Sequence, residues 1–276
     1  MQISVVIPTH NRAHTLERAL RSVLTQTSEA NEILVIDDGS VDNTRELITR
    51  QFPQVRLLPQ QQRGVSAARN LGIKEAQFDW IALLDSDDEW LANKLETIRQ
   101  HYHRNRDILL FHSDEIWIRD GVRVNPMKKH QKSGGMIFSH CLPLCVISPS
   151  AAVIHRQLFE DVGLFNENLP ACEDYDLWLR ICQRFPVHYI DQPLIRKYGG
   201  HEDQLSRRFI GMDRFRIRAL HDLMQSNTLT PEQAQQTRQM LLNKLRILIK
   251  GAYKHRNHEL LLEFEPLLAH YEAMAC

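Results

Sequence analysis

Residues 80–88 read Trp80-Ile81-Ala82-Leu83-Leu84-Asp85-Ser86-Asp87-Asp88, an apolar run that passes directly into an acidic cluster. The apolar run predicts a buried strand, so the acidic cluster is expected at that strand's carboxyl end. Three carboxylates this close together repel one another unless a cation lies between them. Hard oxygen ligands suit Mg²⁺ or Mn²⁺, which would hold the phosphates of an activated substrate. For such a motif in isolation, the alternative is a solvated acidic turn.

Three further apolar runs precede this segment, at residues 3–7, 33–36 and 55–58. Segments of helical period separate them, so the first hundred residues alternate between strand and helix. This alternation predicts an α/β fold whose sheet carries helices on its faces. Ligands bind at the carboxyl ends of the strands in such a sheet, so the loops after the four strands mark the expected site.

The pattern changes after Asp88. Strands are predicted at 108–112, 115–118 and 122–124, and Asp120-Gly121 between the last two is a strong hairpin signal. A mixed sheet follows from this prediction. Farther on, Glu173 and Asp174 are expected in the first turn of a helix, where the helix dipole favours carboxylates.

The last part of the chain, from residue 207 onward, has a helical composition. Thr230-Pro231-Glu232-Gln233 combines an N-cap threonine, a proline at the first helical position and a glutamine at N3, which predicts a helix start. We therefore expect a helical appendage over 207–276, without chemistry of its own.

Charge and cysteine content restrict the class of protein. The chain of 276 residues has 34 basic and 34 acidic residues, so its net charge gives no reason to expect a nucleic acid partner. Five cysteines without a CxxC pair, and a start without a signal-peptide pattern, indicate a reduced, cytoplasmic protein. No stretch approaches the roughly 20 apolar residues that cross a bilayer, so any membrane contact would be peripheral.

Four strand-end motifs occur in order along the chain. They are Pro8-Thr9-His10-Asn11-Arg12, Asp37-Asp38-Gly39-Ser40, Gly64-Val65-Ser66-Ala67-Ala68-Arg69-Asn70 and Asp85-Ser86-Asp87-Asp88, and Glu173-Asp174 with Trp178 follows. This series resembles the family-2 inverting glycosyltransferases of the GT-A fold over about residues 1–205. The resemblance implies a Rossmann-like nucleotide-sugar-binding domain with a mixed central sheet over 1–206, and the helical appendage over 207–276.

The first two motifs offer polar groups to a nucleotide. Pro8 is expected to end the first strand, while Thr9 and Asn11 carry short side chains that suit a base edge or cap the next helix. The resemblance implies that Asp38 accepts a hydrogen bond from an imide N–H such as that of uracil, and that Asp37 supports the loop. Turn capping is the alternative role for Asp38.

The third and fourth motifs are expected around the sugar and the phosphates. Arg69 lies among small residues, and a guanidinium there would neutralise a diphosphate or contact the base; an ordinary surface arginine is the alternative. The resemblance assigns Asp85 to the ribose or the metal shell, and it places Arg12 and Ser86 among the donor-binding residues.

Two residues are candidates for a metal. The resemblance assigns Asp87 to direct coordination of Mn²⁺ or Mg²⁺ bridging the two phosphates. His201 follows Gly199-Gly200 in a segment that resembles the loop that closes over the donor in many members. Imidazole can bind Mn²⁺, although a histidine in a loop can equally have no such role.

Inverting transfer needs a base that takes the proton of the acceptor hydroxyl as its oxygen attacks the anomeric carbon. The resemblance gives this role to Asp174, with Glu173 as the second candidate. The alternative is that both carboxylates only favour the helix N-terminus.

These observations together predict a metal-dependent inverting glycosyltransferase. The resemblance implies that it moves a hexosyl or N-acetylhexosaminyl group to a hydroxyl of a glycan or lipid-linked glycan, in the synthesis of a surface polysaccharide such as lipopolysaccharide. The resemblance also implies a UDP-sugar as the donor, and other nucleotide sugars are the alternative. We expect it in the cytoplasm or peripherally at the inner face of the membrane. The rivals are an inactive nucleotide-sugar-binding protein, which should lack Asp87 or Asp174, and a nucleotidyltransferase, which should carry a glycine-rich triphosphate loop at 8–12.

Overall fold

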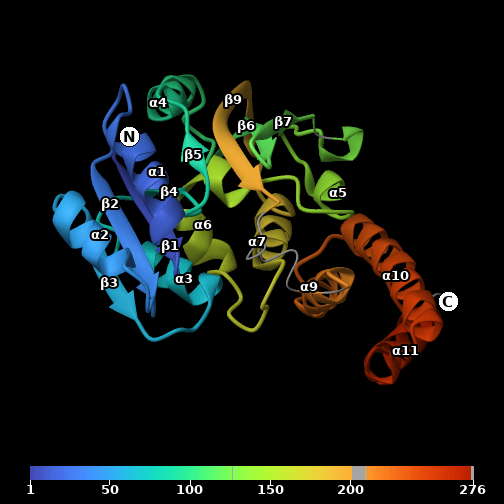
Figure 1. Cartoon of the computed structure of the whole chain (residues 1–276). Coiled ribbons are helices and arrows are strands. Elements are labelled where there is room, and N and C mark those ends of the chain that lie inside the picture. Colours follow the sequence, from blue (N-terminus) through green and yellow to red (C-terminus); the bar gives the residue numbers. More distant parts are fainter. Residues whose placement is uncertain (126, 201–208, 210, 275–276) are drawn as a thin grey trace.

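A mixed sheet forms the centre of the computed structural model, which describes residues 1–125, 127–200, 209 and 211–274 (Figure 1). The strand order is β3-β2-β1-β4-β8-β6-β9-β5, with β7 paired to β6. The strands are β1 (Ile3–Thr9), β2 (Glu32–Asp38), β3 (Arg56–Gln60), β4 (Trp80–Leu83), β5 (Glu89–Trp90), β6 (Leu110–Arg119), β7 (Val122–Val124), β8 (Val153–His155) and β9 (His188–Gly199). The predicted α/β class with a mixed sheet is confirmed.

The first four strands are parallel, as predicted. Pro8 does not end β1, because it pairs with Ile36 and the strand continues through Thr9. The N–H of Leu84 donates to the carbonyl of Val6, so the even-numbered residues of β1 turn their peptide groups toward β4. β4 ends opposite Val6, so no strand residue of β4 lies beside position 8 to accept a backbone N–H. A proline, which has no N–H, therefore fits at this position.

The second half of the sheet is mixed. β8 runs antiparallel to both β4 and β6, while β6 and β9 are parallel with irregular register between Ser113 and Glu115. The two strands predicted at 108–112 and 115–118 are in fact one strand, β6. The irregularity breaks the period-two pattern without breaking the strand. Asp120 and Gly121 have φ of 49° and 76° at the predicted hairpin between β6 and β7.

Helices cover both faces of the sheet. They are α1 (Ala13–Leu24), α2 (Thr44–Gln51), α3 (Val65–Glu75), α4 (Lys94–Arg104), α5 (Phe138–Cys141), α6 (Arg156–Val162), α7 (Glu173–Cys182), α9 (Asp213–Gln225), α10 (Pro231–Lys254) and α11 (His258–Ala273), with short 3-10 turns η1 (Lys128–His130) and η2 (Pro149–Ala151). Val5 and Ala82 belong to the core with α1, α2 and α4, whereas Val6 and Ile81 face the core with α3 and α7. Neighbouring strand residues point to opposite faces, so each apolar strand supplies both cores.

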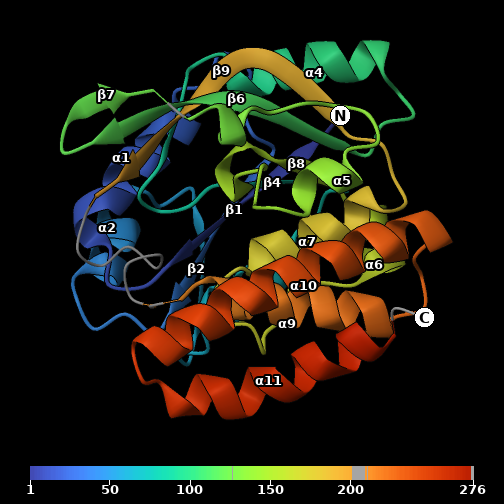
Figure 2. The ribbon, with the colours of Figure 1, turned by 90° about the vertical axis from the view of Figure 1, so that its right-hand side faces the viewer.

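The C-terminal helices pack beside α7 and α5, far from α2 and β3 (Figures 1 and 2). α10 begins with the predicted capping box, in which Thr230 and Gln233 satisfy each other's backbone N–H groups. Phe215 of α9 and Leu245 of α10 share one apolar cluster with Trp178 of α7. The predicted boundary at residue 206 lies next to residues outside the described part, and it stays a prediction.

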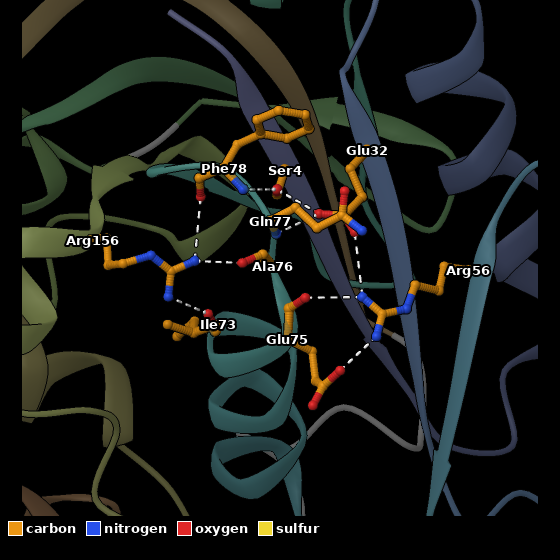
Figure 3. A network of polar contacts seen from close by, with 9 residues as sticks. All are labelled: Ser4, Glu32, Arg56, Ile73, Glu75, Ala76, Gln77, Phe78 and Arg156. Carbon is orange, nitrogen blue, oxygen red and sulfur yellow. Dashed lines mark hydrogen bonds and ion pairs between the residues drawn. The ribbon is translucent and has the colours of Figure 1, made fainter.

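A polar network fixes α3 at the amino end of the sheet (Figure 3). Arg156 donates to the carbonyl oxygens of Ile73 and Ala76 at distances of 3.0 and 2.6 Å, and Arg56 donates to that of Glu75 at 2.9 Å. These guanidinium groups satisfy carbonyls that the end of a helix leaves without intrahelical partners. The opposite end of α3 is thereby held toward the carboxyl ends of the strands.

Candidate active site

The acidic segment follows β4 at the carboxyl edge of the parallel strands. The side chains of Asp85 and Asp87 are 28% and 20% exposed, so both reach the surface of this edge. Asp88 is buried, accepts a hydrogen bond from Ser150 and another from the backbone of Tyr198, and ties the segment to η2 and β9. Burial, and then the charges of Asp87 and Asp85, raise the pKa of Asp88 well above its ordinary value.

Arginines compensate two of these carboxylates. Arg12 Nη1 lies 2.8 Å from Asp87 Oδ2, and Arg69 Nη2 lies 2.7 Å from Asp85 Oδ1. Arginine side chains from the first and third motifs therefore relieve part of the predicted repulsion within the acidic segment. Only the tertiary fold brings them there, since Arg12 and Asp87 are 75 residues apart.

Arg69 connects the acidic segment to α7. Its Nη1 donates to Glu173 Oε1 at 2.6 Å while its Nη2 holds Asp85, and the arginine side chain is only 4% exposed. Burial alone would lower the pKa of Arg69, but the charges of Asp85 and Glu173 raise it above its ordinary value. This geometry supports a positioning role for Arg69 rather than direct contact with a ligand.

Glu173 and Asp174 occupy different environments in the first turn of α7. Glu173 is buried and paired to Arg69, whereas Asp174 is partly exposed. Asp174 Oδ1 accepts the N–H of Tyr175 at 2.7 Å, and its Oδ2 accepts the thiol of Cys145 at 3.2 Å. Only the second acid of this pair therefore offers a carboxylate to a ligand.

The loops after β1 and β2 interlock. Asn11 accepts the N–H of Val41 through its side chain, and its own N–H donates to the hydroxyl of Ser40. α1 instead begins after Arg12 without a side-chain cap, so the expected capping by Thr9 or Asn11 is wrong. The side chain of Asn11 is used between the loops, 30 residues along the chain.

Asp38 is buried and accepts three hydrogen bonds, one from the last residue of β3 and two from the loop that follows. Its Oδ1 receives Gln60 Nε2 at 2.6 Å and the N–H of Arg63 at 2.8 Å, and its Oδ2 receives the N–H of Gly64 at 2.8 Å. Asp38 thus shapes the backbone that leads into α3 and Arg69. Its contact with a nucleotide stays a prediction, as do those of Pro8, Thr9, Asn11 and Ser86.

The profile of the family described as Glycosyl transferase family 2 matches residues 4–163, more than half of the 276-residue chain. The chain belongs to this family. The resemblance seen in the four strand-end motifs is thereby confirmed.

Relatives of the chain differ in size. An uncharacterized glycosyltransferase of Rickettsia felis is 30% identical over 213 residues, which cover 75% of this chain and 35% of the relative. The Escherichia coli protein WfgD, named UDP-Glc:alpha-D-GlcNAc-diphosphoundecaprenol beta-1,3-glucosyltransferase, is 34% identical over 181 residues, covering 65% of this chain and 69% of WfgD. The chain thus spans about a third of the length of the Rickettsia felis relative.

Solved structures confirm the GT-A fold of this family-2 chain. Staphylococcus aureus TarS, residues 1–349 in complex with UDP-GlcNAc, aligns with a TM-score of 0.70 at 18% identity, covering 89% of this chain and 72% of TarS. At this identity the likeness establishes the fold alone. Among the described helices, none is both long and apolar enough to span a membrane.

Several residues of the site were not predicted from the sequence. Cys145 reaches Asp174, Ser150 reaches both Asp88 and the backbone of Asp85, and Arg18 donates to the main chain of Asp87. Each comes from a helix or loop remote from its partner in sequence. Burial, and then the charge of Asp174, raise the pKa of the Cys145 thiol well above its ordinary value, which keeps its proton available for donation.

The described part of the chain offers few side chains that could bind a metal ion. No cluster of three or more histidines, cysteines, aspartates or glutamates there has the arrangement of a metal site. Asp85 and Asp87 provide partly exposed carboxylate oxygens, a donor type that fits Mg²⁺ or Mn²⁺. The other predicted ligand, His201, lies outside the described residues.

Proposed function

We propose that the chain transfers a sugar from a UDP-sugar donor to a hydroxyl of a glycan or lipid-linked glycan, with inversion at the anomeric carbon. The single observation that carries this proposal is the bridge from Asp85 through Arg69 to Glu173. The bridge holds the acidic segment after β4 beside α7, the helix that carries Asp174. Family membership supports the reaction class. The bound UDP-GlcNAc of TarS and the substrates in the name of WfgD support the donor and acceptor classes.

Asp174 is the proposed base. Its carboxylate is partly exposed and is oriented by the N–H of Tyr175 and the thiol of Cys145. As the acceptor oxygen bonds to the anomeric carbon, its proton passes to Asp174 and the bond to the nucleotide diphosphate breaks. Glu173, buried against Arg69, then serves to hold the arginine rather than to take the proton.

A divalent cation would be held by Asp87 with Asp85, and His201 is proposed as a further ligand. When bound, Mn²⁺ or Mg²⁺ supplies positive charge to the leaving diphosphate. Arg12 contacts Asp87 in this structure. When Asp87 binds the cation instead, the guanidinium of Arg12 can contact the same diphosphate. Asp38, Pro8, Thr9, Asn11 and Ser86 are proposed to line the nucleoside.

The test combines a panel of nucleotide sugars with product analysis by NMR. We expect transfer to require Mn²⁺ or Mg²⁺ and the new bond to have the anomeric configuration opposite to that of the donor. Retention of configuration would refute the single displacement. Binding of a nucleotide sugar without any turnover, or release of pyrophosphate from a nucleoside triphosphate, would instead favour one of the two rivals.

A further inference from the structure

A cavity of about 540 Å³ lies outside the strand-end site, beside the segment that carries Cys145. η1, the residues after it, α5 and the residues after α5 form its walls. The lining includes Lys128, Lys129, Lys132, His140, Pro143 and Leu144. Within the described part of the chain, no lining residue carries a carboxylate. Such a cavity suits an anionic group better than a neutral sugar.

The floor of the cavity is fixed by buried contacts. Lys132, with a side chain only 5% exposed, donates to the carbonyl of Val146 at 3.0 Å and lies 3.3 Å from Glu115 Oε2. Ser133 Oγ lies 2.8 Å from His140 Nδ1, which fixes the orientation of the imidazole. Lys132 and His140 are thus held in place before any ligand arrives, which limits the cost of ordering them on binding.

The rim carries the uncompensated charge. Lys128 and Lys129 are exposed, and neither ammonium forms an ion pair with any residue that the structure describes. Burial lowers the pKa of His130, and the charge of Lys129 lowers it further. Burial and then the charge of Lys132 lower the pKa of His112 to about 3. In both histidines the charge of a lysine that lines the cavity adds to the larger effect of burial, while the charge of Glu115 opposes it.

The cavity and the proposed base share one segment of chain. Leu144 lines the cavity, and the next residue, Cys145, places its thiol 3.2 Å from Asp174 Oδ2. α10 steadies the same segment, because Lys244 donates to the carbonyl of Pro143 at 2.9 Å. α5, which carries His140, contacts α7, which carries Asp174 (Figure 2). The cavity and Asp174 are thus connected through residues 143–145 and through the contact between α5 and α7.

We propose that this cavity binds the phosphate of a phosphorylated acceptor and thereby presents the acceptor hydroxyl to Asp174. The inference rests on the proposed function and adds the acceptor's chemical class. Lysine ammonium groups bind phosphate as point charges, and Pro143 and Leu144 provide an apolar wall next to them. The phosphate can belong to a lipid diphosphate or to a phosphodiester within a glycan.

Titration calorimetry in saturating UDP tests the cavity directly, since UDP occupies the donor side. The probes are an N-acetylglucosamine diphosphate ester of a ten-carbon alcohol, an oligomer of glycerol phosphate, and a neutral decyl glycoside. We expect at least one phosphate-bearing probe to bind tenfold or more tightly than the glycoside. The tighter of the two phosphate-bearing probes identifies the source of the phosphate.

The double variant Lys128→Gln/Lys129→Gln should lose most of the difference in affinity between the phosphate-bearing probe and the neutral glycoside. The control Lys250→Gln, at an exposed position of α10, should keep this difference. Equal binding of charged and neutral probes by the wild type, or an unchanged preference in the double variant, would overturn the inference. Hydrolysis of the nucleotide sugar by water should be the same in all three proteins. If the wild type does not hydrolyse the nucleotide sugar at all, that result would instead count against the proposed function.

Discussion

Replacement of Arg69 by methionine is the sharpest test of the site. The variant keeps a long apolar side chain but removes the guanidinium that lies 2.6 Å from Glu173 and 2.7 Å from Asp85. Glu173, only 6% exposed, would then be a buried carboxylate without its counter-charge. Breaking a buried pair in this way costs about 3–5 kcal/mol, a large part of the roughly 5–15 kcal/mol that stabilises a domain.

A double variant separates charge burial from loss of packing. Arg69→Met/Glu173→Met removes both buried charges, so most of the lost free energy of unfolding should return. Transfer should be abolished in both variants, because neither has the bridge from Asp85 to Glu173. Arg63→Met is the matched control, because Arg63 is 64% exposed in its pair with Glu167 and its loss should change stability by less than about 1 kcal/mol.

The assay is urea denaturation of the wild type, Arg69→Met, Glu173→Met, the double variant and the control Arg63→Met. The first three variants and the wild type form a double-mutant cycle. We expect the single Arg69 variant to unfold at much lower urea with an unchanged slope. A stability within about 1 kcal/mol of the wild type would refute the reasoning. So would a double variant no more stable than Arg69→Met, because the buried charge of Glu173 would then not be the cause.

Three further predictions follow from individual residues. Asp174→Asn should lower turnover by about 10²–10⁴ while the donor Kd, measured by calorimetry, stays nearly constant; the reverse outcome would exclude Asp174 as base. UDP should bind the wild type more tightly with Mn²⁺ than with EDTA, and Asp87→Asn should remove this difference; equal affinities throughout would exclude Asp87. Burial lowers the pKa of Lys94 to about 7; the charge of Glu115 acts against this shift, and the charge of Lys132 adds to it. Between pH 7 and 10.5 the unfolded chain thus binds a proton that the folded chain lacks, so the free energy of unfolding should rise with pH there, and Lys94→Met should abolish this part of the rise.

Local patterns in the sequence were sufficient for much of the fold. The apolar runs predicted β1 to β4, Asp120-Gly121 predicted the hairpin, and Thr230 with Gln233 predicted the start of α10. Each of these features depends on residues close together in the chain, so its physical cause is present in a short segment. The order of the four strand-end motifs identified the family for the same reason, because each motif is a short segment of consecutive residues.

The sequence did not predict how those motifs contact one another. Arg69 looked like a ligand contact, yet it bridges Asp85 and Glu173, which is 104 residues away. Cys145 carried no signal, because its meaning depends on Asp174, 29 residues farther on. Pro8 was expected to end β1, and only the early end of β4 beside it explains why the strand continues.

The sequence alone therefore determined the first four strands, the hairpin between β6 and β7, the start of α10 and the residue types gathered at the carboxyl edge of the sheet. The tertiary structure decided which carboxylates are exposed, which are paired to arginine, and which acid of Glu173-Asp174 can meet a ligand. The physical reason is that burial and charge compensation depend on partners that lie 16 to 104 residues apart along the chain and become neighbours only when the sheet and its helices have packed.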